Sequence, residues 1–132
     1  MANDAIPFFE DGDELTATAT VAVIGKRFVI VTGDLQADGT LSAGPAADNT
    51  RALGVAMYDA AIGRRFTLHT IESGHVMPVR AAANLAANTP VCSDATGQAR
   101  AAVAGERALG IVLTGVVAGA DAMVLLSRFT AA

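Results

Sequence analysis

Hydrophobic and polar residues alternate with a two-residue period over short stretches of this chain. Threonine and alanine alternate from Leu15 in LTATATVAV, and residues 28–32 form an apolar, mostly β-branched run that ends at a Gly-Asp pair. A two-residue period in β-branched residues favours half-buried strands over helices. We therefore expect strands over both stretches.

Turn residues separate these runs. The Asp-Gly pair at 38–39 lies between LQA and TLSA, and Gly97 lies between PVCSDAT and QARA. Both predict hairpin turns, because aspartate and glycine tolerate positive φ. Residues 72–74, between FTLHTI and HVMPVR, predict a further hairpin, with Pro78 at a sheet edge or bulge. The alanines of residues 81–90 leave room for one short helix.

One segment occurs twice. RALGVAMYDAAIG at residues 51–63 returns as RALGIVLTGVVAG at residues 107–119, an offset of 107 − 51 = 56. Internal similarity at a fixed period marks a structural unit that cannot bury its apolar face alone, so we expect two similar β units that cover each other. Gly54 and Gly110 share one position of the repeat, which predicts a bulge or a close approach of two backbones.

The fold class predicted from these patterns is all-β, as a barrel or sandwich, because short strands and 13 glycines dominate the chain. A chain of 132 residues is one domain by size. We expect an extended N-terminal arm over residues 1–14 and a single β domain over residues 15–132. The predicted core consists of apolar residues within the expected strands: Val29, Val31, Leu53, Val55, Phe66, Leu68, Val91, Leu109, Ile111, Val124 and Leu126.

Composition indicates an assembly protein. Apolar residues make up 52% of the chain and charged residues 17%, compared with about 25% charged in an average protein. Part of the apolar surface is therefore expected to face a partner. Five of the 13 acidic residues lie in the first 14 positions, without a base among them, and the net charge is −4. A nucleic-acid surface needs clustered Lys and Arg, so nucleic acid is excluded as a partner.

The sequence shows no signal for a membrane or for secretion, which predicts a cytoplasmic site of synthesis. The uncharged run at residues 108–120 is shorter than the roughly 20 residues of a membrane-spanning helix, so no membrane segment is predicted. The acidic N-terminus is unlike a secretory signal. Cys92 is the single cysteine and cannot form an internal disulfide, which suits synthesis in a reducing cytoplasm.

The candidate chemistry is sparse. Ser73 and His75 lie two residues apart beside Glu72, but this spacing places no carboxylate behind the histidine of a catalytic triad. His69 and His75 could bind a metal ion across the expected hairpin, yet no cysteine or second carboxylate stands at a suitable spacing. Two surface or strand histidines are the favoured interpretation. The chain has neither a phosphate-binding glycine loop nor a dinucleotide fingerprint. We predict no catalytic residue, metal site or cofactor, and hence no enzyme.

Four blocks carry a resemblance to a known family. They are FFEDGDELTATATVAVIGKRFVIVTG, LGVAMYDAAIG with FTLHTIESGHVMPV, PVCSDATGQARAA, and LGIVLTGVVAGADAMVLL. Their order, with two LG(V/I) units and a D-A-T-G turn between them, resembles the capsid cement, or decoration, proteins of tailed bacteriophages. The resemblance extends from about Phe8 to Phe129.

The resemblance implies a small β-barrel or β-tulip-like protein on the outer surface of an expanded phage head. It implies that the protein clamps neighbouring major capsid protein subunits, often as a homotrimer at threefold or quasi-threefold positions, and so stabilises the head. In this setting the acidic, apolar arm suits docking by strand addition to the capsid. The expected capsid-binding residues are Ile6, Pro7, Phe8, Phe9, Glu10, Asp11, Asp13 and Glu14.

A different class of function fits the same observations. A virion-exposed binding module could recognise a carbohydrate or a cell-surface ligand. Sugar sites usually rely on aromatic platforms, and this chain has no Trp and a single Tyr, Tyr58. We therefore expect a virion structural protein that is made in the host cytoplasm.

Overall fold

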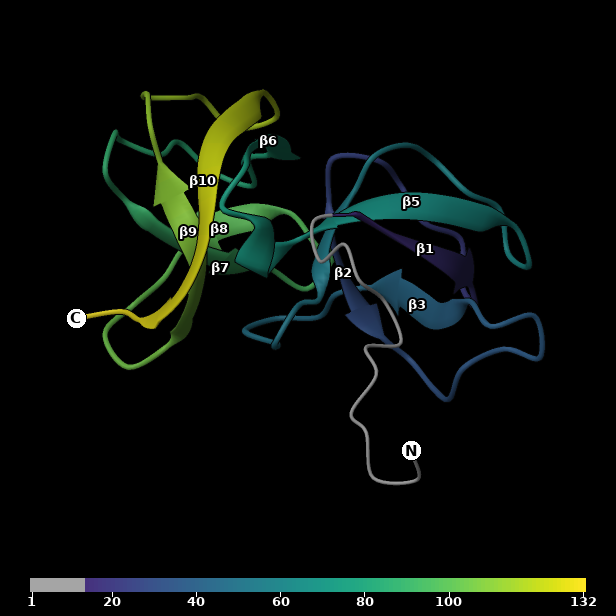
Figure 1. Cartoon of the computed structure of the whole chain (residues 1–132). Helices are drawn as coiled ribbons and strands as arrows, with labels where there is room; N and C mark the ends of the chain where they lie inside the picture. Colours follow the sequence, from purple (N-terminus) through teal and green to yellow (C-terminus); the bar gives the residue numbers. More distant parts are fainter. Residues whose placement is uncertain (1–13) are drawn as a thin grey trace.

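Residues 14–132, which the computed structural model describes, form ten β-strands arranged as two successive β units (Figure 1). The helical backbone in this range is limited to one 3-10 turn, η1 (Ile71–Ser73). The all-β, barrel-type fold predicted from the sequence is therefore confirmed. No helix in the described range is long and apolar enough to span a membrane.

The first unit is a closed barrel. Its strands lie in the order β1-β3-β2-β4-β5, and β1 closes the barrel by pairing with β3 in parallel and with β5 in antiparallel orientation. The turn predicted at residues 38–39 joins β2 to β3, and Gly39 has a φ of 86° there. The strands are β1 (Glu14–Ala19), β2 (Phe28–Val31), β3 (Leu41–Pro45), β4 (Gly54–Ala56) and β5 (Arg65–Thr70).

The second unit is a five-stranded sheet in the order β6-β10-β9-β7-β8. The predicted turn at Gly97, where φ is 85°, joins β7 to β8, and Pro78 lies on the edge strand β6, as expected. The strands are β6 (Val76–Arg80), β7 (Pro90–Ser93), β8 (Ala99–Ala101), β9 (Arg107–Val112) and β10 (Asp121–Thr130).

The two units repeat the same connections outside the regular strands. An antiparallel bridge joins Val23 to Ala60 in the first unit, and another joins Leu85 to Val116 in the second. Each bridge has two backbone hydrogen bonds of 2.8–2.9 Å. The repeat seen in residues 51–63 and 107–119 is therefore part of a longer structural duplication, which the sequence of the first strands no longer shows.

The units differ in how far they close. In the first unit, β1 and β3 align three consecutive residue pairs, ending at Ala19 and Ala43. In the second, a single parallel bridge between Ala81 and Ala99 occupies the corresponding place. The second sheet is therefore curved like a barrel, but among residues 14–132 its two edges are joined only by this bridge.

Gly54 and Gly110 lie where two backbones approach closely, as the repeat predicted. A Cβ atom at Gly54 would lie 2.0 Å from the carbonyl oxygen of His69, and one at Gly110 would lie 2.5 Å from that of Leu125. Neither position has room for a side chain. The two glycines allow β4 to pack against β5 and β9 against β10.

Two hydrophobic cores stabilise the molecule. The smaller core fills the barrel and includes Val29, Phe66 and Leu68. The larger core fills the second unit but also contains Phe28 and Val55 of the first. Successive side chains of a strand point to opposite faces, so β2 directs Phe28 into the shared core and Val29 into the barrel. The two units therefore cover each other.

Two predicted core residues lie outside both cores: Val31 is on the surface, and Ile111 is half-buried. Val31 is 49% exposed, so its assignment to the core is wrong. It is the last residue of β2 and lies in a surface depression beside Arg51 and Glu72. The two-residue period of the strand is real and Val31 still pairs with Ala43 of β3, but its side chain is left uncovered.

The hairpin predicted at residues 72–74 is also wrong. β5 pairs with β1 and β4, whereas β6 pairs with β10, so the two strands that flank this turn belong to different units. The turn is η1, followed by Gly74 in the left-handed region. It is the junction between the two units, and turn residues alone cannot distinguish a junction from a hairpin.

The short helix allowed for residues 81–90 does not form. This segment makes the bridges of Ala81 and Leu85 and a turn in which Asn88 has a φ of 68°. The alanines there serve close packing, since Ala81 is fully buried in the shared core.

Candidate interaction surfaces

Most residues predicted to bind the capsid lie outside the described range. They are Ile6, Pro7, Phe8, Phe9, Glu10, Asp11 and Asp13. Glu14 is the described member of the set and is the first residue of β1, where its Cα pairs with that of His69 on β5. The N-terminal segment therefore joins the body at the β1–β5 strand pair.

Glu14 belongs to a small polar cluster with the two histidines. Glu14 Oε1 lies 3.3 Å from His69 Nε2, and His69 Nδ1 lies 3.1 Å from His75 Nδ1. If His69 donates its Nε2–H to Glu14, its Nδ1 accepts a hydrogen bond from His75. The histidines meet each other as the sequence allowed, but across the unit junction. Among the described residues, no three metal-ligating side chains converge on one point.

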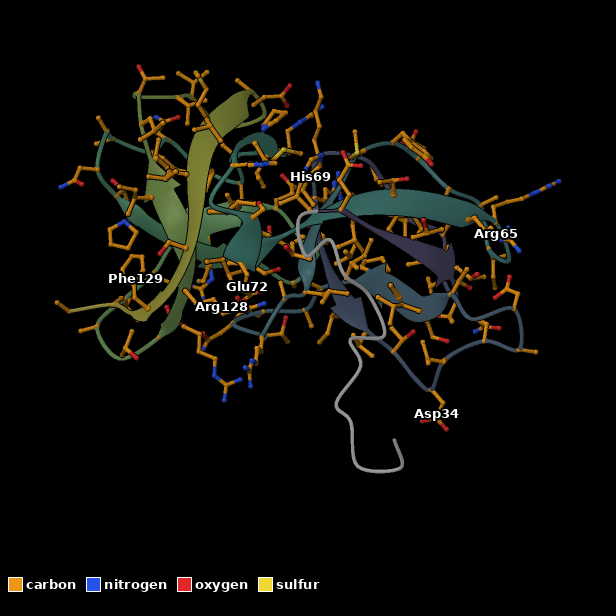
Figure 2. The ribbon with its side chains drawn as sticks, in the orientation of Figure 1. Asp34, Arg65, His69, Glu72, Arg128 and Phe129 are labelled. Atoms are coloured by element: carbon orange, nitrogen blue, oxygen red, sulfur yellow. The ribbon has the colours of Figure 1, made fainter. Side chains whose placement is uncertain are left out.

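The Ser73, His75 and Glu72 side chains do not form a triad. Ser73 Oγ accepts a 3.2 Å hydrogen bond from the backbone N–H of His75, and the carboxylate of Glu72 is turned to Arg128. Figure 2 shows Glu72 and Arg128 side by side at the junction of the units. The hydrogen bond from Arg128 is the main reason that the pKa of Glu72 lies below its usual range.

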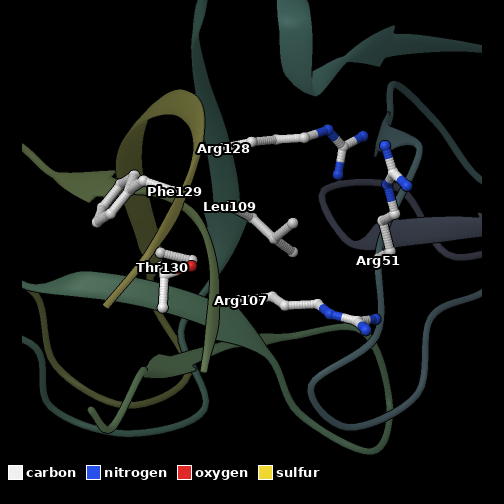
Figure 3. A pocket seen from close by; sticks show the side chains of 7 residues that line it. Arg51, Arg107, Leu109, Arg128, Phe129 and Thr130 are labelled. Atoms are coloured by element: carbon white, nitrogen blue, oxygen red, sulfur yellow. The ribbon is translucent and has the colours of Figure 1, made fainter. Parts of the chain in front are cut away.

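A groove of about 330 Å³ lies between the two units, and three arginines line it. Arg51 comes from the loop before β4, Arg107 from the start of β9 and Arg128 from β10 (Figure 3). The apolar part of the lining includes Leu109 and Phe129. Arg51 and Arg107 are the first residues of the two repeated segments, so the duplication brings equivalent arginines to one groove.

An ion-pair network holds the loop that carries Arg51. Arg100 on β8 donates from Nε to Asp48 Oδ1 at 2.8 Å and from Nη2 to Glu106 Oε2 at 2.7 Å. The bond from Arg100 and a second one from the backbone N–H of Val103 lower the pKa of Glu106 to about 2. Asp48 belongs to the first unit and Glu106 to the second, so Arg100 links the loop to the second unit.

Asn49 completes this link. Its backbone has a φ of 51°, in the left-handed region that asparagine tolerates, and its N–H donates to the carbonyl of Ser93 at 3.0 Å. Its Oδ1 accepts a 3.1 Å hydrogen bond from the backbone N–H of Arg107. Arg51, two residues further on, is therefore held opposite Arg107.

Charge in the groove is only partly compensated. Arg128 bonds to Glu72 and donates from Nη2 to the carbonyl oxygen of Ala52 at 2.6 Å. Within residues 14–132, neither Arg51 nor Arg107 forms an ion pair. The three arginines and Glu72 leave a surplus of two positive charges in a protein of net charge −4.

Sequence reasoning missed this groove. The sequence predicts that the duplicated Arg-Ala-Leu-Gly segments are scaffold. In the structure their Ala and Gly positions are buried in both copies, while Leu109 is buried and Leu53 half-buried. Their arginines are exposed instead. The available signal was that two of the nine basic residues occupy the same position of the repeat.

An apolar patch, formed by Ile24, Met57 and Tyr58, lies on the first unit. These side chains are between 44% and 49% exposed. Ile24 and Tyr58 are brought near each other because the backbone at Gly25 packs directly against that of Tyr58. This patch fits the expectation from composition that some apolar surface faces a partner.

Comparison with known proteins gives one family. The sequence profile of a family described as phage cement protein matches residues 9–127 of this chain. A search of curated proteins finds no match. The profile spans both β units, so it describes the whole duplicated body rather than one unit.

A solved structure has the same fold. It is the head fiber gp8.5 N base of bacteriophage phi29, with a TM-score of 0.74 and 19% sequence identity. The match covers 90% of this chain and 97% of that one. At this identity the likeness concerns the fold, and it includes nearly all of both chains.

Proposed function

The chain belongs to the phage cement protein family, and from this premise we propose that it binds the outer surface of the expanded head and stabilises contacts between major capsid protein subunits. Family membership supports a capsid decoration role, that of a structural component of the virion. The observation that carries the proposal is the profile match over residues 9–127, most of the chain. The phi29 structure, the base of a head fiber, is consistent with it.

Capsid affinity in this proposal belongs to the N-terminal segment. Ile6, Phe8 and Phe9 supply apolar side chains, and the acidic residues after them can direct docking through charge. An extended segment can add to an exposed sheet edge of the capsid through main-chain hydrogen bonds. The segment is followed by Glu14, the first residue of β1, which pairs with His69 on β5. The point at which the segment is attached to the body is therefore fixed.

Self-association is the second part of the proposal. The Ile24–Met57–Tyr58 patch offers an apolar surface for contact between copies, and we propose a homotrimer at threefold or quasi-threefold positions. Several copies on a shell bind more tightly than one, because each bound segment raises the effective concentration of the next. A ligand that binds only the expanded lattice stabilises that lattice by mass action.

Co-sedimentation with phage heads that lack this protein tests the function. We expect the chain to sediment with expanded heads and to remain in the supernatant with unexpanded ones. A variant with Ile6→Ser, Phe8→Ser and Phe9→Ser should lose binding. The control Ile62→Ser, at a side chain that is 70% exposed on the body, should bind normally. Equal binding to both kinds of head, or normal binding by the triple variant, would contradict the proposal.

A further inference from the structure

We propose that the groove between the two β units is a carboxylate-binding site whose occupant is the acidic stretch of this chain's own N-terminal segment, residues 10–13. The groove contains Arg51, Arg107 and Arg128. The proposed occupant contributes Glu10, Asp11 and Asp13. This inference concerns the free protein, before its N-terminal segment contacts the capsid, and it does not depend on capsid binding.

The groove has the chemistry of an anion site. Guanidinium groups bind carboxylates through paired, charge-assisted hydrogen bonds, and arginine is the side chain best suited to this geometry. Arg128 is already oriented by Glu72 and by the carbonyl of Ala52. Arg51 and Arg107 extend from different units toward the same groove (Figure 3) and have no ionic partner within residues 14–132.

The nearby acidic residues of the described range form no ion pair with these two arginines, although the charge of Glu72 acts on Arg51. Asp48 and Glu106 are both bonded to Arg100, which lies outside the groove lining. Glu72 is bonded to Arg128. Like charges held in one groove repel each other, so a ligand that brings carboxylates relieves this repulsion as well as forming new bonds.

Charge complementarity selects the occupant. The first 14 residues contain five acidic residues and no base, whereas the rest of the chain is nearly neutral. Residues 10–13 are joined to the body by Glu14, whose β1–β5 pair adjoins β4, and β4 follows the loop of Arg51. An extended stretch of four residues spans roughly 13 Å, and each of the neighbouring strands β5 and β4 lies roughly 5 Å from the previous one, so the acidic stretch can extend from Glu14 toward the loop of Arg51 on its own copy.

The apolar lining suits the residues that precede the acidic stretch. Leu109 lies at the base of the groove and Phe129 is 38% exposed at its side. Phe8 and Phe9 precede the acidic stretch directly, so a bound segment can place an aromatic ring against Phe129. Docking of residues 10–13 would leave Ile6 and its neighbours in a fixed direction, ready to contact another protein.

The test uses the full-length chain with its own acidic stretch neutralised by Glu10→Gln, Asp11→Asn and Asp13→Asn, so that the groove is open to an added probe. The probe is a blocked peptide of residues 4–14, DAIPFFEDGDE, and a second peptide carries amides in place of its carboxylates. Binding is followed by NMR titration of the backbone amides. We expect the acidic peptide to shift the amides of Arg51, Leu109 and Phe129, and the amide peptide to leave them unchanged.

Arginine variants in the same background identify the site. Arg51→Gln or Arg107→Gln should each weaken peptide binding about tenfold, the loss of one charge-assisted interaction. Arg64→Gln, at an exposed arginine of the first unit outside the groove, is the matched control and should bind as the parent does. Thermal unfolding checks that all three variants fold equally.

Three results of the peptide titrations would overturn the proposal. They are shifts that map away from the groove, equal binding of the acidic and amide peptides, and arginine variants that bind as tightly as Arg64→Gln. A single-stranded oligothymidylate is titrated in parallel. Tighter binding of the oligonucleotide than of the peptide at these amides would assign the groove to nucleic acid instead.

Discussion

Gly54 in the first β unit and Gly110 in the second occupy equivalent positions, and at both a neighbouring backbone leaves no room for a side chain. Met57 and Leu113 are also equivalent, three residues further along the chain, but their surroundings differ. Each glycine lies against a carbonyl of the neighbouring strand. Met57 lies in the Ile24–Met57–Tyr58 patch. When the two bridges Val23–Ala60 and Leu85–Val116 are aligned, Ala86 takes the place of Ile24 and Thr114 the place of Tyr58. The second unit therefore lacks the large side chains that flank Met57.

The difference separates the roles of the two units. Positions that face the interior had to remain similar after duplication, because strand pairing and close packing depend on them. Several surface positions differ between the units, although the exposed Arg51 and Arg107 are the same. The first unit carries the N-terminal segment and the apolar patch, while the second supplies most of the shared core and, through Arg107 and Arg128, most of the groove.

The largest loss of stability is expected at Phe28, a first-unit side chain that lies in the core shared by both units. Phe28→Ala should lower the free energy of unfolding by about 3–5 kcal/mol, because it empties part of the shared core. Phe66→Ala, within the barrel core, is the control of similar size. Chemical denaturation measures both. Phe28→Ala alone should also shift the amides of Leu109 and Val124, and if those amides do not move, the core is not shared.

Substitutions of Gly54 and Gly110 test whether the neighbouring backbone excludes a side chain equally in the two units. Gly54→Ala and Gly110→Ala should each destabilise the fold by about 1–3 kcal/mol through overpacking. The cost should be larger at Gly54, where the nearest carbonyl oxygen would lie at 2.0 Å rather than 2.5 Å. Gly33→Ala is the control, because its Cβ would meet nothing closer than 3.9 Å. A cost at Gly33 equal to that at Gly54 would contradict the close-approach explanation.

Acid should weaken the ion-pair network around Arg100. The pKa of Glu106 is lowered to about 2 in the folded protein from an ordinary value of 4.5, so its ionised form is stabilised by folding. Its contribution is therefore complete above about pH 4.5 and is lost as the pH falls toward 2. Glu106→Gln should flatten the pH dependence of unfolding in this window. Thermal melts at several pH values measure it, and an unchanged slope would exclude Glu106 as a source.

The smallest effect is expected at the surface, where the units differ. Met57→Asp should weaken self-association about fivefold or more, since a charge in the apolar patch costs on the order of 1 kcal/mol at a contact. Leu113→Asp, at the equivalent position of the second unit, is the matched control and should associate as the parent does. Sedimentation equilibrium measures both, and equal loss in the two variants would mean that the patch does not define the contact.

Much of this fold could be predicted from local signals. Asp38-Gly39 and Gly97 mark turns by backbone requirement alone, and the repeated Arg-Ala-Leu-Gly segments point to the close approach at Gly54 and Gly110. The junction at residues 72–74 could not be recognised, because strand partners depend on contacts far along the chain.

The candidate surfaces were less accessible to sequence reasoning. The groove needs Arg51 and Arg107, which are 56 residues apart, and Arg128 from the last strand. Only the packing of one unit against the other brings them together. The meeting of Glu14 with His69 likewise depends on the register of β1 against β5. The predicted docking residues from Ile6 to Asp13 lie outside the described range and remain a prediction.

Cryo-electron microscopy of expanded heads decorated with this chain tests the central claim most directly. The account predicts density for the two-unit body on the outer surface, over contacts between neighbouring major capsid protein subunits, with residues 6–9 at the interface with the capsid. Density at any other part of the virion, or a body attached to the head without contact from residues 6–9, would contradict it.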